Sequence, residues 1–212
     1  RIDFVALARC NKRWMGHSDF TAFQLAAFSA AGMVTFAGPM AAYDFGAREP
    51  SAFTQHHCWT LFESERHAVD CVLDGPDADV EGTLWGGNLA LVAHLAGSRH
   101  LPRIADGILV LEDIGESPYR IERMLYQLHF CGVLERQRAI LLGTFNGYDA
   151  SPNDNGHDLE AVVRHWRERL AVPLYTGLPF GHVRDKLTLP VGGRARLSVR
   201  AGSATLSLWG YA

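Results

Sequence analysis

The sequence predicts an α/β protein in two parts: the remainder of a parallel α/β domain, then a C-terminal α/β domain with a small antiparallel β section. Apolar strands alternate with helices along most of the chain. The tail instead alternates apolar and polar residues, with glycines at its turns. A polar, acidic stretch around Gly75-Pro76 separates the parts, so we expect domains at residues 1–77 and 78–212.

Capping residues and apolar spacing predict the elements in order. Gly32 ends the first helix, and Ser117-Pro118 opens the third with a cap and a proline at its first position. We expect helices at 20–31, 89–96, 118–131 and 159–170, strands at 14–15, 33–36, 108–111, 139–142 and 172–176, and short antiparallel strands between 187 and 208.

The composition excludes several classes of protein. The 212 residues are 48% hydrophobic and 20% charged, as in a globular chain rather than a disordered or fibrous one. A net charge of −3 indicates no nucleic-acid partner, and the apolar runs are too short for a membrane span, which needs about 20 residues. The four cysteines form no C-x-x-C pair and no zinc-ligand spacing, so we expect reduced thiols in the cytoplasm, no metal and no cofactor.

Ser18 is the first candidate for chemistry. It stands between an apolar strand and a buried helix, after Gly16, which is the layout of a nucleophile elbow. The N–H groups at such a helix start, that of Asp19 in particular, can hold an oxyanion. The alternative is that Ser18 or Asp19 only caps the helix, and Phe20 replaces the second glycine of G-x-S-x-G.

Glu112 and His182 also stand at strand ends. Glu112 follows the apolar run at 108–111, where α/β proteins place their sites, and His182 ends a glycine-bounded loop. Each has a plain alternative, a solvated carboxylate or a structural loop histidine. The chain order Ser, Glu, His is that of α/β serine hydrolases, in which a carboxylate orients the imidazole that activates the serine.

A glycine pair before a helix offers a further binding feature. Gly87 and Asn88 could present free N–H groups to a substrate carboxylate, with Trp85 as a further contact, or Asn88 could simply cap its own helix. For Arg120 and Arg123, ion pairs with nearby glutamates are the favoured interpretation.

Five ordered segments resemble the bacterial LD-carboxypeptidases, serine peptidases of murein recycling related to the microcin-immunity peptidases. They are G-H-S-D-F-T (16–21), V-T-F-A-G-P-M (34–40), E-G-T-L-W-G-G-N-L (81–89), I-L-V-L-E-D-I-G-E-S-P-Y-R-I-E-R-M-L (108–125) and T-G-L-P-F-G-H (176–182). The resemblance implies that Ser18 is the nucleophile, that Glu112 orients the base and that His182 is the base. It also implies a cleft between two domains, a cytoplasmic homodimer and a murein tetrapeptide substrate that loses its terminal D-alanine.

The resemblance leaves three alternatives open. The same triad could act on a peptidyl-adenylate of the microcin type, the chain could bind muropeptides without turnover, or it could be a metallohydrolase. Family members carry further residues before the position of Arg1, including a glycine-rich segment near the nucleophile. We therefore expect an N-terminal portion to be missing here and the oxyanion hole to be incomplete.

Overall fold

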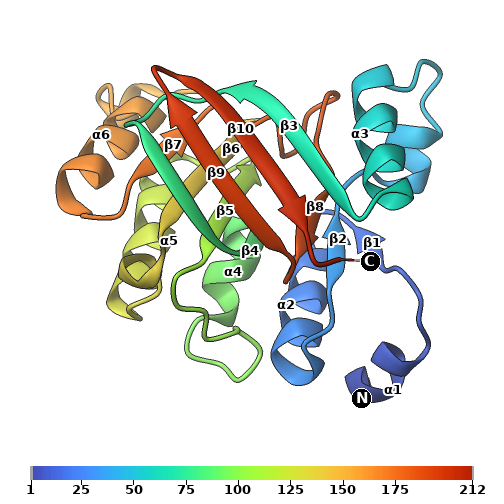
Figure 1. Ribbon diagram of the computed structural model, residues 1–212. Helices are drawn as coiled ribbons and strands as arrows, with labels where there is room; N and C mark the ends of the chain where they lie inside the picture. Colours follow the sequence, from blue (N-terminus) through green and yellow to red (C-terminus); the bar gives the residue numbers. More distant parts are fainter. Residues whose placement is uncertain (1, 212) are drawn as a thin grey trace.

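Residues 2–211, which the computed structural model describes, are arranged around two β-sheets with helices packed against them (Figure 1). The three-stranded sheet has the order β1-β2-β8 and the seven-stranded sheet the order β3-β10-β9-β4-β5-β6-β7. The strands are β1 (Met15–Gly16), β2 (Thr35–Ala37), β3 (Arg66–Val72), β4 (Ala78–Asn88), β5 (Ile108–Ile114), β6 (Ala139–Asn146), β7 (Leu174–Thr176), β8 (Leu189–Val191), β9 (Arg194–Arg200) and β10 (Ser203–Trp209).

The helices alternate with these strands along most of the chain. In Figure 1, α4 and α5 lie side by side below the parallel half of the large sheet, and α6 packs against α5 at the left. They are α1 (Phe4–Arg9), α2 (Phe20–Ala31), α3 (Ala52–Glu63), α4 (Leu89–Leu95), α5 (Pro118–Phe130) and α6 (Leu159–Arg169), with short turns of π-helix at Ala41–Phe45 and of 3-10 helix at Leu134–Arg136 and Pro152–Asp154.

The predicted fold class is confirmed. Strands β4 to β7 pair in parallel, and β3, β10, β9 and the start of β4 form the antiparallel section at the other end of the same sheet. Residues Ile108–Leu111 of β5 are all buried, as expected of a parallel strand covered on both faces. In β9 and β10 every second side chain is buried, which is the predicted alternation.

Two strands exchange between the predicted parts. Strand β3 precedes residue 77 but pairs with β10 in the large sheet, and β8 comes late in the chain but pairs with β2 in the small one. The boundary at residues 77 and 78 therefore stays a prediction.

Helix α3, strand β3 and most of β4 were not predicted. In β3 one inward position is His67, a polar residue that hides the alternation.

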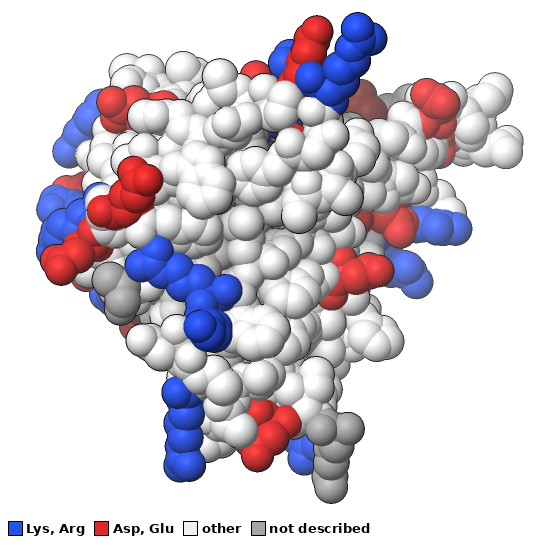
Figure 2. Space-filling view, turned by 90° about the vertical axis from the view of Figure 1, so that its right-hand side faces the viewer, with Lys and Arg blue, Asp and Glu red and all other residues white. Residues whose placement is uncertain are grey.

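Charge is dispersed on the face that Figure 2 shows: Lys and Arg side chains stand among Asp and Glu, separated by uncharged surface. This face carries no broad patch of one sign of the kind that a nucleic-acid backbone requires. No helix within residues 2–211 is long and apolar enough to span a bilayer.

The segment between β7 and β8, residues 177–188, has no regular secondary structure and is held by buried polar contacts. Lys186 is 1% exposed, and its Nζ lies 2.7 Å from Oδ1 of the buried Asp44. The Lys186 N–H donates to Oγ1 of Thr54, and the Ser51 hydroxyl donates to Asp185. These contacts fix the loop against α3 and the π-helical turn.

The Lys186–Asp44 pair gives the first prediction. Lys186→Met leaves the Asp44 carboxylate buried without its cation, so the free energy of unfolding should fall by about 3–5 kcal/mol. The double variant Lys186→Met/Asp44→Leu removes both charges and should recover part of that loss. Urea titration followed by tryptophan fluorescence measures both. A single variant as stable as the wild type would show that the pair does not hold this segment.

Candidate active site

Ser18 lies on a strained turn between β1 and α2. Its φ is +57°, a left-handed conformation that is costly for a residue with a side chain and that typifies nucleophile elbows. A Cβ at Gly16 would lie 2.4 Å from the ring of Phe20, so the tight turn requires glycine there. Ser18 itself is half-buried.

The alternative that Ser18 or Asp19 caps α2 finds no support. Asp19 occupies the N-cap position but its side chain makes no capping bond, and within residues 2–211 the Ser18 hydroxyl bonds to no group. The N–H groups of Phe20 and Thr21 donate to the carbonyls of His17 and Ser18, whereas that of Asp19 has no acceptor in the described part of the chain. A backbone N–H without an acceptor, next to the nucleophile, is the kind of donor from which an oxyanion hole is built.

Glu112 and His182 are brought together although 70 residues separate them. Nδ1 of His182 lies 2.7 Å from Oε2 of Glu112, and Glu112 is 1% exposed. Gly181, with φ +130°, leaves room for the carboxylate, because a Cβ there would lie 3.2 Å from Oε2. The side-chain amide of Asn146 donates to the His182 carbonyl at 2.9 Å and fixes the backbone of the loop.

Asn88 supports the carboxylate from the neighbouring strand. Register pairs Asn88 with Glu112, and the Asn88 Nδ2 donates to Oδ1 of Asp113 at 2.8 Å and to Oε1 of Glu112 at 3.4 Å. Its Oδ1 caps α4 by accepting from the N–H of Leu91, as the alternative reading held. Burial raises the pKa of Glu112, and the charge of His182 together with hydrogen bonds from His182 and Asn88 opposes that shift.

At Asn88, strand β4 of the large sheet contacts helix α2, which follows β1 of the small sheet. The Asn88 N–H donates to the hydroxyl of Thr21 in the first turn of α2, at 3.1 Å. Gly87, with φ +133°, allows the approach, since a Cβ there would lie 2.5 Å from the Thr21 hydroxyl oxygen. Gly87 thus allows the close packing and Asn88 positions Glu112, whereas their contact with a substrate stays a prediction.

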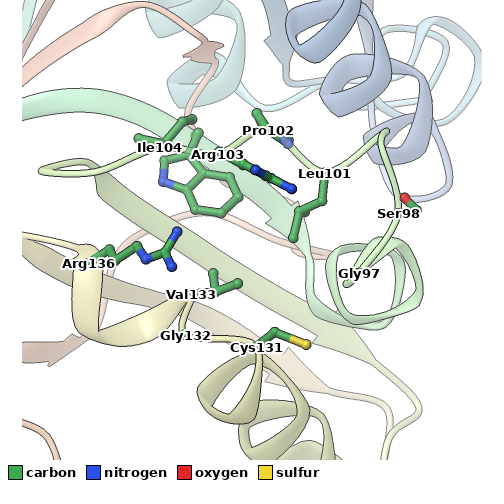
Figure 3. A pocket seen from close by; sticks show the side chains of 11 residues that line it. Gly97, Ser98, Leu101, Pro102, Arg103, Ile104, Cys131, Gly132, Val133 and Arg136 are labelled. Carbon is green, nitrogen blue, oxygen red and sulfur yellow. The ribbon is translucent and has the colours of Figure 1, made fainter.

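Trp85 lies elsewhere. It pairs with Leu109 near the start of β5, is 1% exposed, and donates its indole N–H to Gln137 at 2.9 Å. It borders a pocket of about 480 Å³ whose other walls precede β5 and β6, at the sheet edge opposite Glu112. Figure 3 shows this pocket, with Leu101 and Pro102 on one side and Val133 and Arg136 on the other. Trp85 is therefore packed in the core in this structure, and its contact with a substrate stays a prediction.

His17 is a site residue that sequence reasoning missed, because it occupies the variable position of the G-x-S motif. Its ring centroid lies 4.5 Å from that of His182 and 5.9 Å from that of Phe180. The side chain is 6% exposed, and its Nε2 has no hydrogen-bond partner among the described residues. Burial lowers the pKa of His17 to about 4, and the charges of His182 and Lys186 add to the shift.

Comparison with known proteins shows to which family the chain belongs. A family model described as the LD-carboxypeptidase C-terminal domain matches residues 81–197, more than half of the chain. The chain belongs to the LD-carboxypeptidase family. The matched residues include Glu112 and His182.

Similar proteins of known name are consistent with membership of the LD-carboxypeptidase family. The crystal structure of muramoyltetrapeptide carboxypeptidase from Oxalobacter formigenes is 49% identical with a TM-score of 0.95, covering 99% of this chain and 72% of that one. The murein tetrapeptide carboxypeptidase of Pseudomonas aeruginosa is 41% identical over 128 residues, 59% of this chain and 40% of its own length. The microcin C7 self-immunity protein MccF of Escherichia coli is 26% identical over 224 residues, 90% of this chain and 64% of its own length.

The chain spans about two thirds of the length of the curated relatives that it matches along nearly its whole extent, such as the probable murein peptide carboxypeptidase of Bacillus subtilis.

The buried His17 predicts a pH dependence of stability. Its folded pKa of about 4 is below the ordinary 6.5, so the unfolded chain binds the extra proton. The contribution of neutral His17 to the free energy of unfolding is complete above pH 6.5 and is lost as the pH falls from 6.5 through about 4. Between about pH 7.5 and about pH 5, the wild type should lose about 2 kcal/mol more than His17→Phe. Denaturant titration of both proteins measures this, and parallel losses would contradict it.

Proposed function

We propose that this protein is a serine LD-carboxypeptidase that releases the terminal D-alanine from murein tetrapeptides. The observation that carries the proposal is the 2.7 Å hydrogen bond between Glu112 and His182, whose ring lies 4.5 Å from that of His17, the residue before the strained Ser18. The named activities of the 49% and 41% identical relatives support the choice of substrate.

The mechanism uses Ser18, His182 and Glu112 in the order of a serine hydrolase. His182 takes the proton of the Ser18 hydroxyl as its oxygen attacks the carbonyl carbon of the L,D peptide bond. The resulting oxyanion accepts a hydrogen bond from the N–H of Asp19, a contact worth about 3–4 kcal/mol in comparable sites. His182 then gives its proton to the departing amine of D-alanine, and water hydrolyses the acyl-enzyme.

Glu112 fixes the ring of His182 and stabilises the imidazolium that forms. Because Glu112 is withdrawn from water, its charge acts on His182 through a medium of low dielectric constant. Within residues 2–211 no hydrogen bond joins Ser18 to His182. This contact is commonly long in unliganded hydrolases and shortens when substrate binds.

Two further parts of the proposal follow from family membership. We place the enzyme in the cytoplasm, where murein fragments are recycled, and expect a homodimer. Cell fractionation and light scattering test these two statements separately from the chemistry.

Replacement of the nucleophile tests the proposal. Ser18→Ala should lower the rate of D-alanine release by about 10⁶-fold and leave the unfolding transition nearly unchanged, because only the hydroxyl is lost. The matched control is Ser29→Ala, an exposed serine on the same helix whose hydroxyl donates to the carbonyl of Arg99. That variant should keep the full rate.

The assay measures D-alanine released from a murein tetrapeptide, in this chain and in any longer natural form of it. Equal rates in Ser18→Ala and the wild type would contradict the triad. Binding of tetrapeptide without release in every form would make the protein a muropeptide-binding module. Faster hydrolysis of a peptidyl-adenylate than of the tetrapeptide would keep the triad and replace the substrate.

A further inference from the structure

His17 is a buried base that the proposed reaction does not use. It is more than nine-tenths buried, yet its Nε2 has no hydrogen-bond partner in the described part of the chain. An imidazole nitrogen left unpaired in the interior is unfavourable, because it loses its hydrogen bonds to water and gains none in the protein. The ring is held in place by Phe180 and by the ring of His182, 4.5 Å away.

His17 completes a set of three donors with Glu112 and His182. One ligand atom from each of these residues lies within 4.8 Å of the other two. The donors come from three separate parts of the fold: the β1–α2 turn, the end of β5 and the loop before β8. Two imidazoles and one carboxylate are a ligand set that zinc enzymes use, with a fourth position left open.

The surroundings suit a cation. Asp113 adds a second buried carboxylate beside Glu112, while the nearby positive charge of Lys186 is paired with Asp44. Because the Nε2 of His17 has no hydrogen-bond partner among the described residues, this nitrogen is available to a metal ion. Nitrogen donors favour Zn²⁺ and its neighbours over Mg²⁺ and Ca²⁺, which prefer oxygen.

We propose that His17, Glu112 and His182 form a binding site for Zn²⁺ or a similar divalent transition-metal ion, and that this ion switches the peptidase off. The metal binds lone pairs of the two imidazoles and one carboxylate oxygen, with no change of oxidation state. If it occupies Nε2 of His182, that nitrogen can no longer take the proton of Ser18. If it occupies Nδ1, it replaces the hydrogen bond to Glu112. Inhibition rests on the proposed peptidase activity, whereas metal binding does not.

Direct titration of metal-free protein with Zn²⁺, in competition with a chromophoric chelator, tests the site. The wild type should bind one ion that His17→Phe binds at least about tenfold more weakly, while Mg²⁺ does not compete. Ser18→Ala should bind as the wild type, since the hydroxyl is not a donor. His57→Gln is the matched control, because the half-buried His57 pairs with His67 at 2.9 Å in another part of the fold, and its loss should leave this site intact.

X-ray absorption of the zinc-loaded wild type identifies the ligands without any variant. The expected first shell holds two imidazole nitrogens and carboxylate oxygen. A sulfur neighbour would assign the ion to one of the free cysteines and overturn the proposal, as would unchanged affinity in a folded His17→Phe.

The peptidase assay separates the two proposals. Added Zn²⁺ should inhibit D-alanine release by the wild type at concentrations at least about tenfold lower than those needed for His17→Phe, each compared with its own zinc-free rate. If no form releases D-alanine but the ion binds as described, the proposed function fails and the metal site stands. If release is insensitive to Zn²⁺ while the ion is bound, the switch is wrong.

Discussion

A carboxylate withdrawn from water is the constraint on which the site depends. Burying an ionised group costs several kcal/mol, and the charge of His182 together with the hydrogen bonds from His182 and Asn88 offsets that cost for Glu112. Each of these partners is itself fixed, Asn88 by its role as cap of α4 and His182 by the glycine before it and by Asn146. The geometry of the imidazole is therefore set by the fold and not by a mobile surface loop.

The exchange of strands between the sheets brings the three residues together. The loop that carries His182 runs directly into β8, which pairs with β2, and β2 pairs with β1, the strand that leads to Ser18. Glu112 belongs to the large sheet, and the bond from Asn88 to Thr21 ties that sheet to the helix after Ser18. Separation of the two sheets would break the bond between Asn88 and Thr21, so a contact that joins the parts of the fold also holds the site together.

Much of this could be predicted from the sequence. The helix at 20–31 has the predicted bounds, and Ser18 lies in the predicted turn between β1 and α2. Glu112 lies within β5, which runs three residues beyond the predicted strand end at 111, and His182 lies in the loop that follows β7. The features that could not be predicted depend on contacts between segments that lie far apart in the sequence. The burial of Trp85 follows from its pairing with Leu109 and its bond to Gln137, and His17 is buried only because Phe180 and His182 cover it. No local pattern encodes such contacts.

The central claim is that His182, oriented by Glu112, activates Ser18. The most direct measurement is labelling with a fluorophosphonate, which reacts only with an activated serine hydroxyl, followed by intact-mass and peptide analysis. The account predicts one adduct per chain, located at Ser18 and lost in His182→Ala. An adduct at another serine, or labelling of Ser18 at the same rate without His182, would contradict it.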